Sequence, residues 1–161
     1  ENYQDRKATT FVDIFNTNVS DFYVPYVRPQ ENGNRTDVRW MALMNSEENG
    51  LLISSPSQKG LSITALHMPN EDFDITNDLD YTKENKNANF SKHTTDIKEQ
   101  NLVQLNIDLA QRGLGGDNSW GAKPQDKYQL KSAEKHSYSF YLIPFTKGKT
   151  DTFIKLHQQL K

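Results

Sequence analysis

The sequence predicts an all-β protein, built as an antiparallel β-sandwich. Short runs of β-branched, aromatic and aliphatic residues recur about every 8–12 residues, which is the spacing of strands in a sandwich. Turn signals such as Glu31–Asn34 and Asn49-Gly50 separate these runs. Apolar residues alternate with other residues from Val38 to Met44, which is the period of a strand with one buried face. We therefore expect at least about seven antiparallel strands and no parallel β-α-β unit.

The expected elements follow one another along the chain. Pro25 and Pro29 confine the second strand to a sheet edge or a bent segment, because proline donates no hydrogen bond to a ladder. A short helix is expected near Asn77–Glu84, within a polar stretch, and a second helix in the tail from Thr150. The expected strands cover Ala8–Phe15, Phe22–Arg28, residues 35–44, Leu51–Ser54, Leu61–His67, Leu102–Asp108, Lys127–Leu130 and Ser137–Phe145.

The composition indicates one domain and argues against several classes of partner. The chain has 161 residues, of which 34 % are apolar, and a mean hydropathy of −0.85, so its core is thin for its length. A formal charge of −2, from 19 basic and 21 acidic residues, gives no field that would hold nucleic acid. No apolar run reaches the roughly 20 residues that cross a membrane. With no cysteine, disulfides and thiolate chemistry are excluded, and both cytoplasm and periplasm remain open.

The segment from Gly113 to Gly121 is the most unusual loop in the chain. It does not fit a dinucleotide loop, because Asn118 stands where the third glycine would be, and it lacks the Lys-Ser or Lys-Thr of a phosphate loop. It combines flexible backbone, short polar side chains and one indole. An indole covers the apolar face of a sugar while polar groups bind its hydroxyls. The candidate substrate-binding residues are therefore Trp120, Asp117, Asn118 and Ser119, with Asp117 and Ser119 expected to brace the turn beneath a partly exposed indole. The alternative is that Trp120 anchors the core beside a tight turn.

Ionisable residues outside this loop offer little catalytic pattern. The histidines show no spacing typical of metal ligands, so no metal site is expected; they are His67, His93, His136 and His157. Glycoside hydrolysis needs two carboxylates across the scissile bond, and sequence alone does not give such a distance. The most promising buried acid is Glu31, flanked by Arg28 and Arg35. A structural ion-pair cluster of these three residues is favoured over a catalytic role.

Two blocks of residues together carry a resemblance to a known family. The first contains Glu1-Asn2-Tyr3, Asp5-Arg6, Ser20-Asp21, Tyr23, Pro25-Tyr26-Val27, Pro29, Glu31-Asn32-Gly33 and Arg35. The second contains Leu105-Asn106-Ile107-Asp108, Gly113, Gly115-Gly116-Asp117 and Ser119-Trp120. In order and spacing, the chain resembles the C-terminal end of the large bacterial β-galactosidases of glycoside hydrolase family 2. The resemblance runs from residue 1 to about residue 145 and is loose over residues 69–100.

This resemblance implies a fold, and it implies which functional residues lie in this chain and which lie elsewhere in the parent enzyme. It implies a sandwich of the galactose-mutarotase-like kind, of which this chain is the C-terminal portion. The family's two catalytic glutamates and its Mg²⁺ site lie in a central barrel, so we expect no catalytic residue and no cofactor in this chain, which should be inactive alone. The implied partners are a galactoside and the remainder of the parent polypeptide, with homo-oligomers left open. The family's Gly-Gly-Asp-x-Ser-Trp loop lines the sugar and aglycone pocket through its tryptophan, which corresponds to Trp120.

The resemblance also sets boundaries and leaves alternatives. Residues 1–145 are expected to form the sandwich portion and residues 146–161 a C-terminal extension. Asn118 departs from the family pattern, in which this position often carries aspartate. Two other functions remain open: a free-standing carbohydrate-binding module that uses the Trp120 loop, and an aldose-epimerase-like enzyme. The last would need His67 or His93 to meet Glu31 in one cleft.

Overall fold

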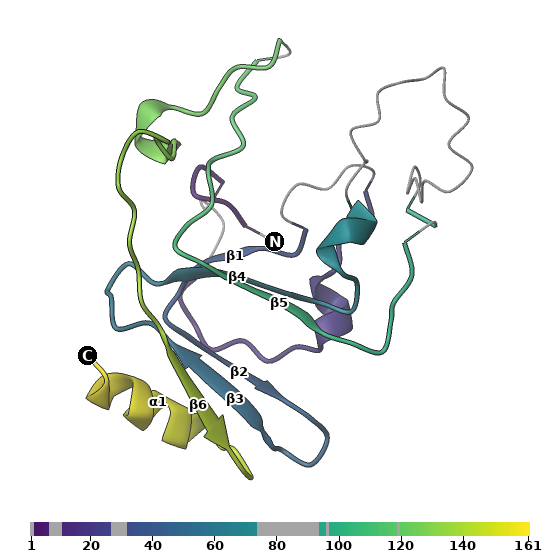
Figure 1. The fold of residues 1–161 in the computed structure, drawn as a ribbon, viewed down its shortest axis with the longest axis vertical. Coiled ribbons are helices and arrows are strands. Elements are labelled where there is room, and N and C mark those ends of the chain that lie inside the picture. The colour runs from purple at the N-terminus through teal and green to yellow at the C-terminus, as the bar shows by residue number, and fades with distance from the viewer. Residues whose placement is uncertain (1, 7–10, 27–31, 74–93, 96, 119) are drawn as a thin grey trace. The chain divides into compact units, whose positions relative to one another are not determined.

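The computed structural model describes residues 2–6, 11–26, 32–73, 94–95, 97–118 and 120–161 (Figure 1). The chain divides into two compact units whose segments alternate along the sequence. The first unit is built from residues 11–34 and 64–106, and the second from residues 2–10, 35–63 and 107–161. Within the described residues, no helix is long and apolar enough to cross a bilayer.

Six strands lie in the described part of the chain, and they form two three-stranded sheets (Figure 1). One sheet has the order β1-β4-β5 and the other β2-β3-β6. β1 pairs antiparallel with β4, and β3 pairs antiparallel with both β2 and β6. This two-sheet antiparallel architecture confirms the predicted all-β sandwich class. The strands are β1 (Arg35–Val38), β2 (Trp40–Met44), β3 (Gly50–Ser54), β4 (Leu61–Leu66), β5 (Gln104–Asp108) and β6 (Tyr141–Phe145).

β2 and β3 form a hairpin whose turn is fixed by Asn45. The Oδ1 atom of Asn45 accepts hydrogen bonds from the backbone N–H groups of Glu47 and Asn49, each at 3.0 Å. A Cβ atom at Gly50 would lie 1.9 Å from the carbonyl oxygen of Leu43, so only glycine fits at the start of β3. The predicted Asn49-Gly50 turn therefore joins two strands.

The helix α1 (Thr150–Gln159) packs on the β2-β3-β6 sheet through Phe153. The Phe153 side chain is 2 % exposed, and its ring centroid lies 4.7 Å from that of Phe145 and 5.9 Å from that of Trp40. His157, one helical turn later, is also buried and shares a 2.8 Å hydrogen bond between its Nδ1 atom and the Ser54 hydroxyl. The helix predicted for the tail is thus confirmed, and Phe153 and His157 are the buried residues on the face that packs on the sheet.

The first unit has a small core of its own. Phe22, at the end of the 3₁₀ turn Val19–Phe22, packs with residues from β4 and from the segments that follow it. The amide of Asn32 accepts a bond from the N–H of Val24 at 2.8 Å and donates one to its carbonyl at 2.7 Å. Gly33, with φ +74°, completes the predicted turn. The core side chains are Phe22, Leu66, Met68 and Ile97, with Tyr23 and Phe73 packed against them.

Four expected strands differ in the structure. Residues 11–15 of the first are described and form no strand, and their apolar side chains are exposed. Of the expected strand Phe22–Arg28, residues 22–26 are described and form no strand, and Phe22 itself ends the 3₁₀ turn Val19–Phe22. In place of the strand Lys127–Leu130, the chain makes the 3₁₀ turn Asp126–Tyr128, because the N–H groups of residues 128 and 129 bond to carbonyls three residues back. The last strand begins at Tyr141 and not at residue 137. The helix expected near Asn77–Glu84 lies outside the described residues. A further 3₁₀ turn covers Asn70–Phe73.

Candidate functional site

The loop that begins at Gly113 is a closed turn held by its own backbone and by Asn118. The N–H of Gly116 donates to the carbonyl of Ala122 at 2.7 Å, which joins the two arms of the loop. The Oδ1 atom of Asn118 accepts from the N–H groups of Trp120 at 2.9 Å and Ala122 at 3.2 Å. Gly116 and Gly121 have φ angles of +75° and +78°, a region closed to most side chains.

Trp120 is presented outward by this loop. Its side chain is 93 % exposed, so Trp120 is not a core anchor within this chain. The other tryptophan, Trp40, is partly buried on β2 and packs against Phe153. An exposed indole offers a large flat apolar face next to polar backbone, which is the surface that sugar rings stack on.

The polar candidates of the loop play different structural parts. Asn118 braces the turn beneath Trp120, a part that we expected Asp117 and Ser119 to play. Asp117 instead forms an ion pair with Arg6, in which Oδ1 lies 3.4 Å from Nη2. Ser119 lies outside the described residues. The difference arises because an Asn side chain at this position reaches N–H groups two and four residues ahead, as in an Asx turn.

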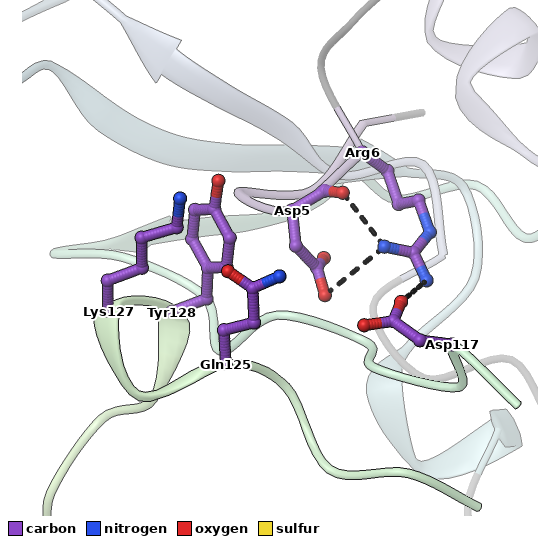
Figure 2. Close-up of a pocket in the computed structure, with 6 residues that line it drawn as sticks. All are labelled: Asp5, Arg6, Asp117, Gln125, Lys127 and Tyr128. Carbon is purple, nitrogen blue, oxygen red and sulfur yellow. Dashed lines mark hydrogen bonds and ion pairs between the residues drawn. The ribbon is translucent and has the colours of Figure 1, made fainter.

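A polar pocket lies beside the base of the loop (Figure 2). Its volume is about 260 Å³. Asp5 lies in the middle of the lining, with Gln125, Lys127 and Tyr128 on one side of it and Arg6 and Asp117 on the other (Figure 2). The ammonium of Lys127 sits 4.7 Å from the centre of the Tyr128 ring. The lining residues are Asp5, Arg6, Asp117, Gln125, Lys127 and Tyr128.

Asp5 connects this pocket to the loop. Its two carboxylate oxygens accept the N–H groups of Leu114 at 3.0 Å and Gly115 at 2.9 Å. Arg6 donates to the carbonyl of Gly115 and, at 3.4 Å, to Asp117 (Figure 2). Burial acts to raise the pKa of Asp5, but these N–H bonds and the Arg6 charge outweigh it and hold the pKa below its ordinary value.

The remaining candidates do not converge on a site in the described residues. Arg28 and Glu31 lie outside these residues, while Arg35 lies on β1, so the predicted ion-pair cluster stays a prediction. Nδ1 of His67 is 2.7 Å from the carbonyl oxygen of Leu102, and Nε2 of His136 is 2.9 Å from that of Lys131. His93, the other histidine weighed for an epimerase-like centre, also lies outside the described residues. Among the described side chains, no three His, Asp or Glu residues gather as metal ligands do.

The comparison with known families matches most of the chain. Residues 1–142 match the family described as beta galactosidase small chain. The chain belongs to the β-galactosidase small-chain family. It is 33 % identical over 145 residues to a β-galactosidase from Priestia megaterium, and 29 % identical over 144 residues to one from Streptococcus thermophilus. Each alignment covers 89 % of this chain. A β-galactosidase from Halalkalibacterium halodurans is 29 % identical over 140 residues.

The match covers only a small part of each relative, and it ends before the C-terminus of this chain. The chain spans about 12 % of the length of these relatives. The matched region ends at residue 142, inside β6, so α1 lies beyond it. The division at residue 145 stays a prediction.

Composition and spacing gave no reason to single out Asp5, Arg6, Gln125, Lys127 or Tyr128 as site residues. Asp5 and Arg6 belong to the first block of the family resemblance, and that block was the one signal in the sequence that pointed to these two residues.

Proposed function

We propose that this chain is the substrate-facing end of a β-galactosidase, which supplies the Trp120 loop while the catalytic carboxylates come from the rest of the enzyme. The observation that carries the proposal is an indole 93 % exposed on a braced loop, in a chain of the β-galactosidase small-chain family. The stacking surface of Trp120 would meet a sugar or its aglycone, and Asp117, Asn118 and Ser119 would lie within reach of hydroxyl groups.

The exposed apolar segment 11–15 supports a role for the remaining polypeptide. Four large apolar side chains lie within five residues, and all are at least half exposed: Phe11 83 %, Val12 81 %, Ile14 50 % and Phe15 75 %. Apolar clusters of this kind are commonly covered by association. The run has the pattern of a strand in the sequence, so the partner proposed here is a strand-forming part of the larger enzyme. The relatives are about seven times as long as this chain, because 89 % of the chain covers 12 % of their length.

The proposal is tested by the kinetics of Trp120 variants in the whole enzyme, that is, this chain together with the remaining polypeptide. Trp120→Ala removes a surface that binds substrate and transition state alike, so KM for an aryl β-galactoside should rise by about 10–100-fold while kcat changes less. Trp120→Phe should recover much of the affinity because an aromatic face remains. Leu130→Ala removes an exposed apolar side chain outside the loop and serves as the control.

Two outcomes would count against this function. An unchanged KM in Trp120→Ala, with folding intact, would remove the substrate contact. Turnover of the aryl β-galactoside by this chain alone, lost on replacing one of its own carboxylates, would show that catalytic groups are in this chain. A titration of the isolated chain with galactosides, followed by indole fluorescence, addresses the module alternative: tight binding without the remaining polypeptide would favour a free-standing carbohydrate-binding module.

A further inference from the structure

Two short segments that are 109 residues apart in sequence form one hydrogen-bonded unit. The N–H groups of Leu114 and Gly115 both point at the carboxylate of Asp5, one to each oxygen. The guanidinium of Arg6 donates to the carbonyl of Gly115 and pairs with Asp117 (Figure 2). Asp5 and Arg6 thus form hydrogen bonds with three consecutive peptide groups of the loop, immediately before the turn that carries Trp120. We call Asp5 and Arg6 the clamp.

The clamp is closely fitted at its carboxyl group, whereas the Arg6 side chain is 43 % exposed. The Asp5 side chain is only 6 % exposed. A Cβ atom at Gly113 would come within 2.7 Å of the Asp5 carboxyl group, and one at Gly115 within 2.4 Å of the Ala122 carbonyl oxygen. Such close approach allows glycine alone at both positions. A carboxylate that accepts two backbone N–H groups is costly to disturb, because hydrogen bonds to a charged acceptor are stronger than neutral ones and both would be weakened together.

The clamp is itself anchored to the sheet within the same unit. The segment Tyr3–Arg6 closes on itself, with the N–H of Arg6 donating to the carbonyl of Tyr3 at 3.0 Å, and the Tyr3 side chain is 5 % exposed. Just before it, Oδ1 of Asn2 accepts from both the N–H and the hydroxyl of Thr36 on β1. The clamp therefore ties the base of the loop to a strand, which is a rigid support.

We propose that Asp5 and Arg6 are positioning residues for the β-galactosidase reaction, which fix the direction in which the loop presents Trp120 to the substrate. This inference rests on the proposed function, since it acts through Trp120. The physical reason is that Gly115 and Gly116 have φ angles of +74° and +75° and would otherwise move freely. Holding the peptide groups at residues 114 and 115, together with the Asp117 carboxylate, restricts the loop before substrate arrives, so less conformational entropy is lost when substrate binds.

The test is a double-mutant cycle in the whole β-galactosidase. Asp5→Asn, Trp120→Ala and the double variant are compared with the parent by KM and kcat for an aryl β-galactoside. An asparagine amide has one acceptor oxygen, so one loop N–H would face an NH₂ group and lose its bond. We expect Asp5→Asn to raise KM about tenfold with kcat changed less than about twofold, and to add nothing to KM when Trp120 is already alanine.

Each outcome separates this inference from the proposed function. If Trp120→Ala leaves KM unchanged, the proposed function fails and the positioning role falls with it. If Trp120→Ala raises KM but Asp5→Asn does not, or if the two effects multiply in the double variant, the positioning role alone is overturned. A lower melting temperature with parental KM would likewise make Asp5 a purely structural residue.

A second variant keeps the test open if Asp5→Asn fails to fold. Arg6→Lys keeps the positive charge but loses the guanidinium, whose Nη2 contacts Gly115 and Asp117 while its Nη1 donates to the Asp5 carbonyl. It should raise KM in the same direction, by about threefold, and again only while Trp120 is present. Glu134→Gln is the control, because it breaks an exposed pair with Lys131 away from the pocket and should leave KM unchanged. Parental KM in Arg6→Lys would overturn the role of the clamp.

Discussion

The two tryptophans of this chain lie in contrasting settings. Trp40 stands on β2, where strand pairing fixes its side, and it packs on Phe153 of α1. Trp120 stands on a glycine-rich turn, where Asn118 and the clamp fix the backbone and the indole is left 93 % exposed. We therefore expect Trp40 to stabilise the fold and Trp120 to contribute almost nothing to stability, which leaves its indole accessible to a ligand.

The largest effect on stability is expected where α1 meets its sheet. Phe153→Ala removes a side chain that is 2 % exposed and contacts Phe145 and Trp40. We expect the free energy of unfolding to fall by about 3–5 kcal/mol, from lost burial and the cavity left behind. Urea unfolding of the purified chain measures this, with the exposed Thr152→Ala as the control. A loss below about 1 kcal/mol would mean that α1 does not hold the sheet.

A pH dependence is expected from the same helix and should be smaller. Burial first, and then the charges of Lys161 and Arg39, lower the pKa of His157 below its ordinary value. Its Nδ1 meets the Ser54 hydroxyl, and its Nε2 has no partner among the described residues. Because the neutral form is favoured when folded, its contribution is complete above the ordinary histidine pKa of about 6.5 and is lost as pH falls through the lower folded value.

The melting temperature of the parent chain should therefore decline as the pH is lowered from 7.5 to 5. His157→Gln should be less stable at neutral pH but should show a shallower decline, since the titrating group is gone. Equal slopes in the two proteins would assign the pH dependence to other groups. Ser54→Ala keeps the histidine and should keep the slope.

A local effect of about 1–2 kcal/mol is expected in the loop. Asn118→Ala removes the acceptor for the N–H groups of Trp120 and Ala122, each bond being worth roughly 0.5–1.5 kcal/mol. The N–H groups of residues 120 and 122 should exchange with solvent faster, while those of β3 should not change. Asn118→Asp keeps the acceptor oxygen and should preserve the protection. Unchanged exchange in Asn118→Ala would show that glycine geometry alone holds the turn.

The strands from residue 35 to residue 66 could be predicted because apolar alternation and Asn-Gly or Lys-Gly turn signals coincide there. The stretch 11–15 carries the same strand signal but has no pairing partner among the described residues, so propensity alone was not enough. Lys127–Leu130 was mispredicted because nothing in its apolar pattern reveals the i→i+3 bonds that curl it.

The candidate site also has one part that the sequence indicated and another part that it did not. The glycine-rich segment with one indole left both an exposed and a core position open for Trp120, and the family resemblance favoured the outward position that the structure shows. The support of the loop could not be foreseen, because Asp5 reaches Gly115 across 110 positions and no local pattern encodes that meeting. Likewise Asp117 was expected to brace the turn, but the presence of Arg6 nearby draws it into an ion pair.

The smallest effect on stability is expected for Trp120→Ala, and it completes the contrast with Phe153→Ala. An indole that is 93 % exposed loses almost no burial when removed, and its backbone N–H bond to Asn118 is kept. We expect the free energy of unfolding of the chain to change by less than about 0.5 kcal/mol, as for surface substitutions generally. The same urea series that measures Phe153→Ala measures this variant. A loss above about 2 kcal/mol would show that Trp120 packs within the folded chain, and an altered KM in the whole enzyme could then come from unfolding of the loop. A near-zero change makes any rise in KM a direct readout of substrate contact.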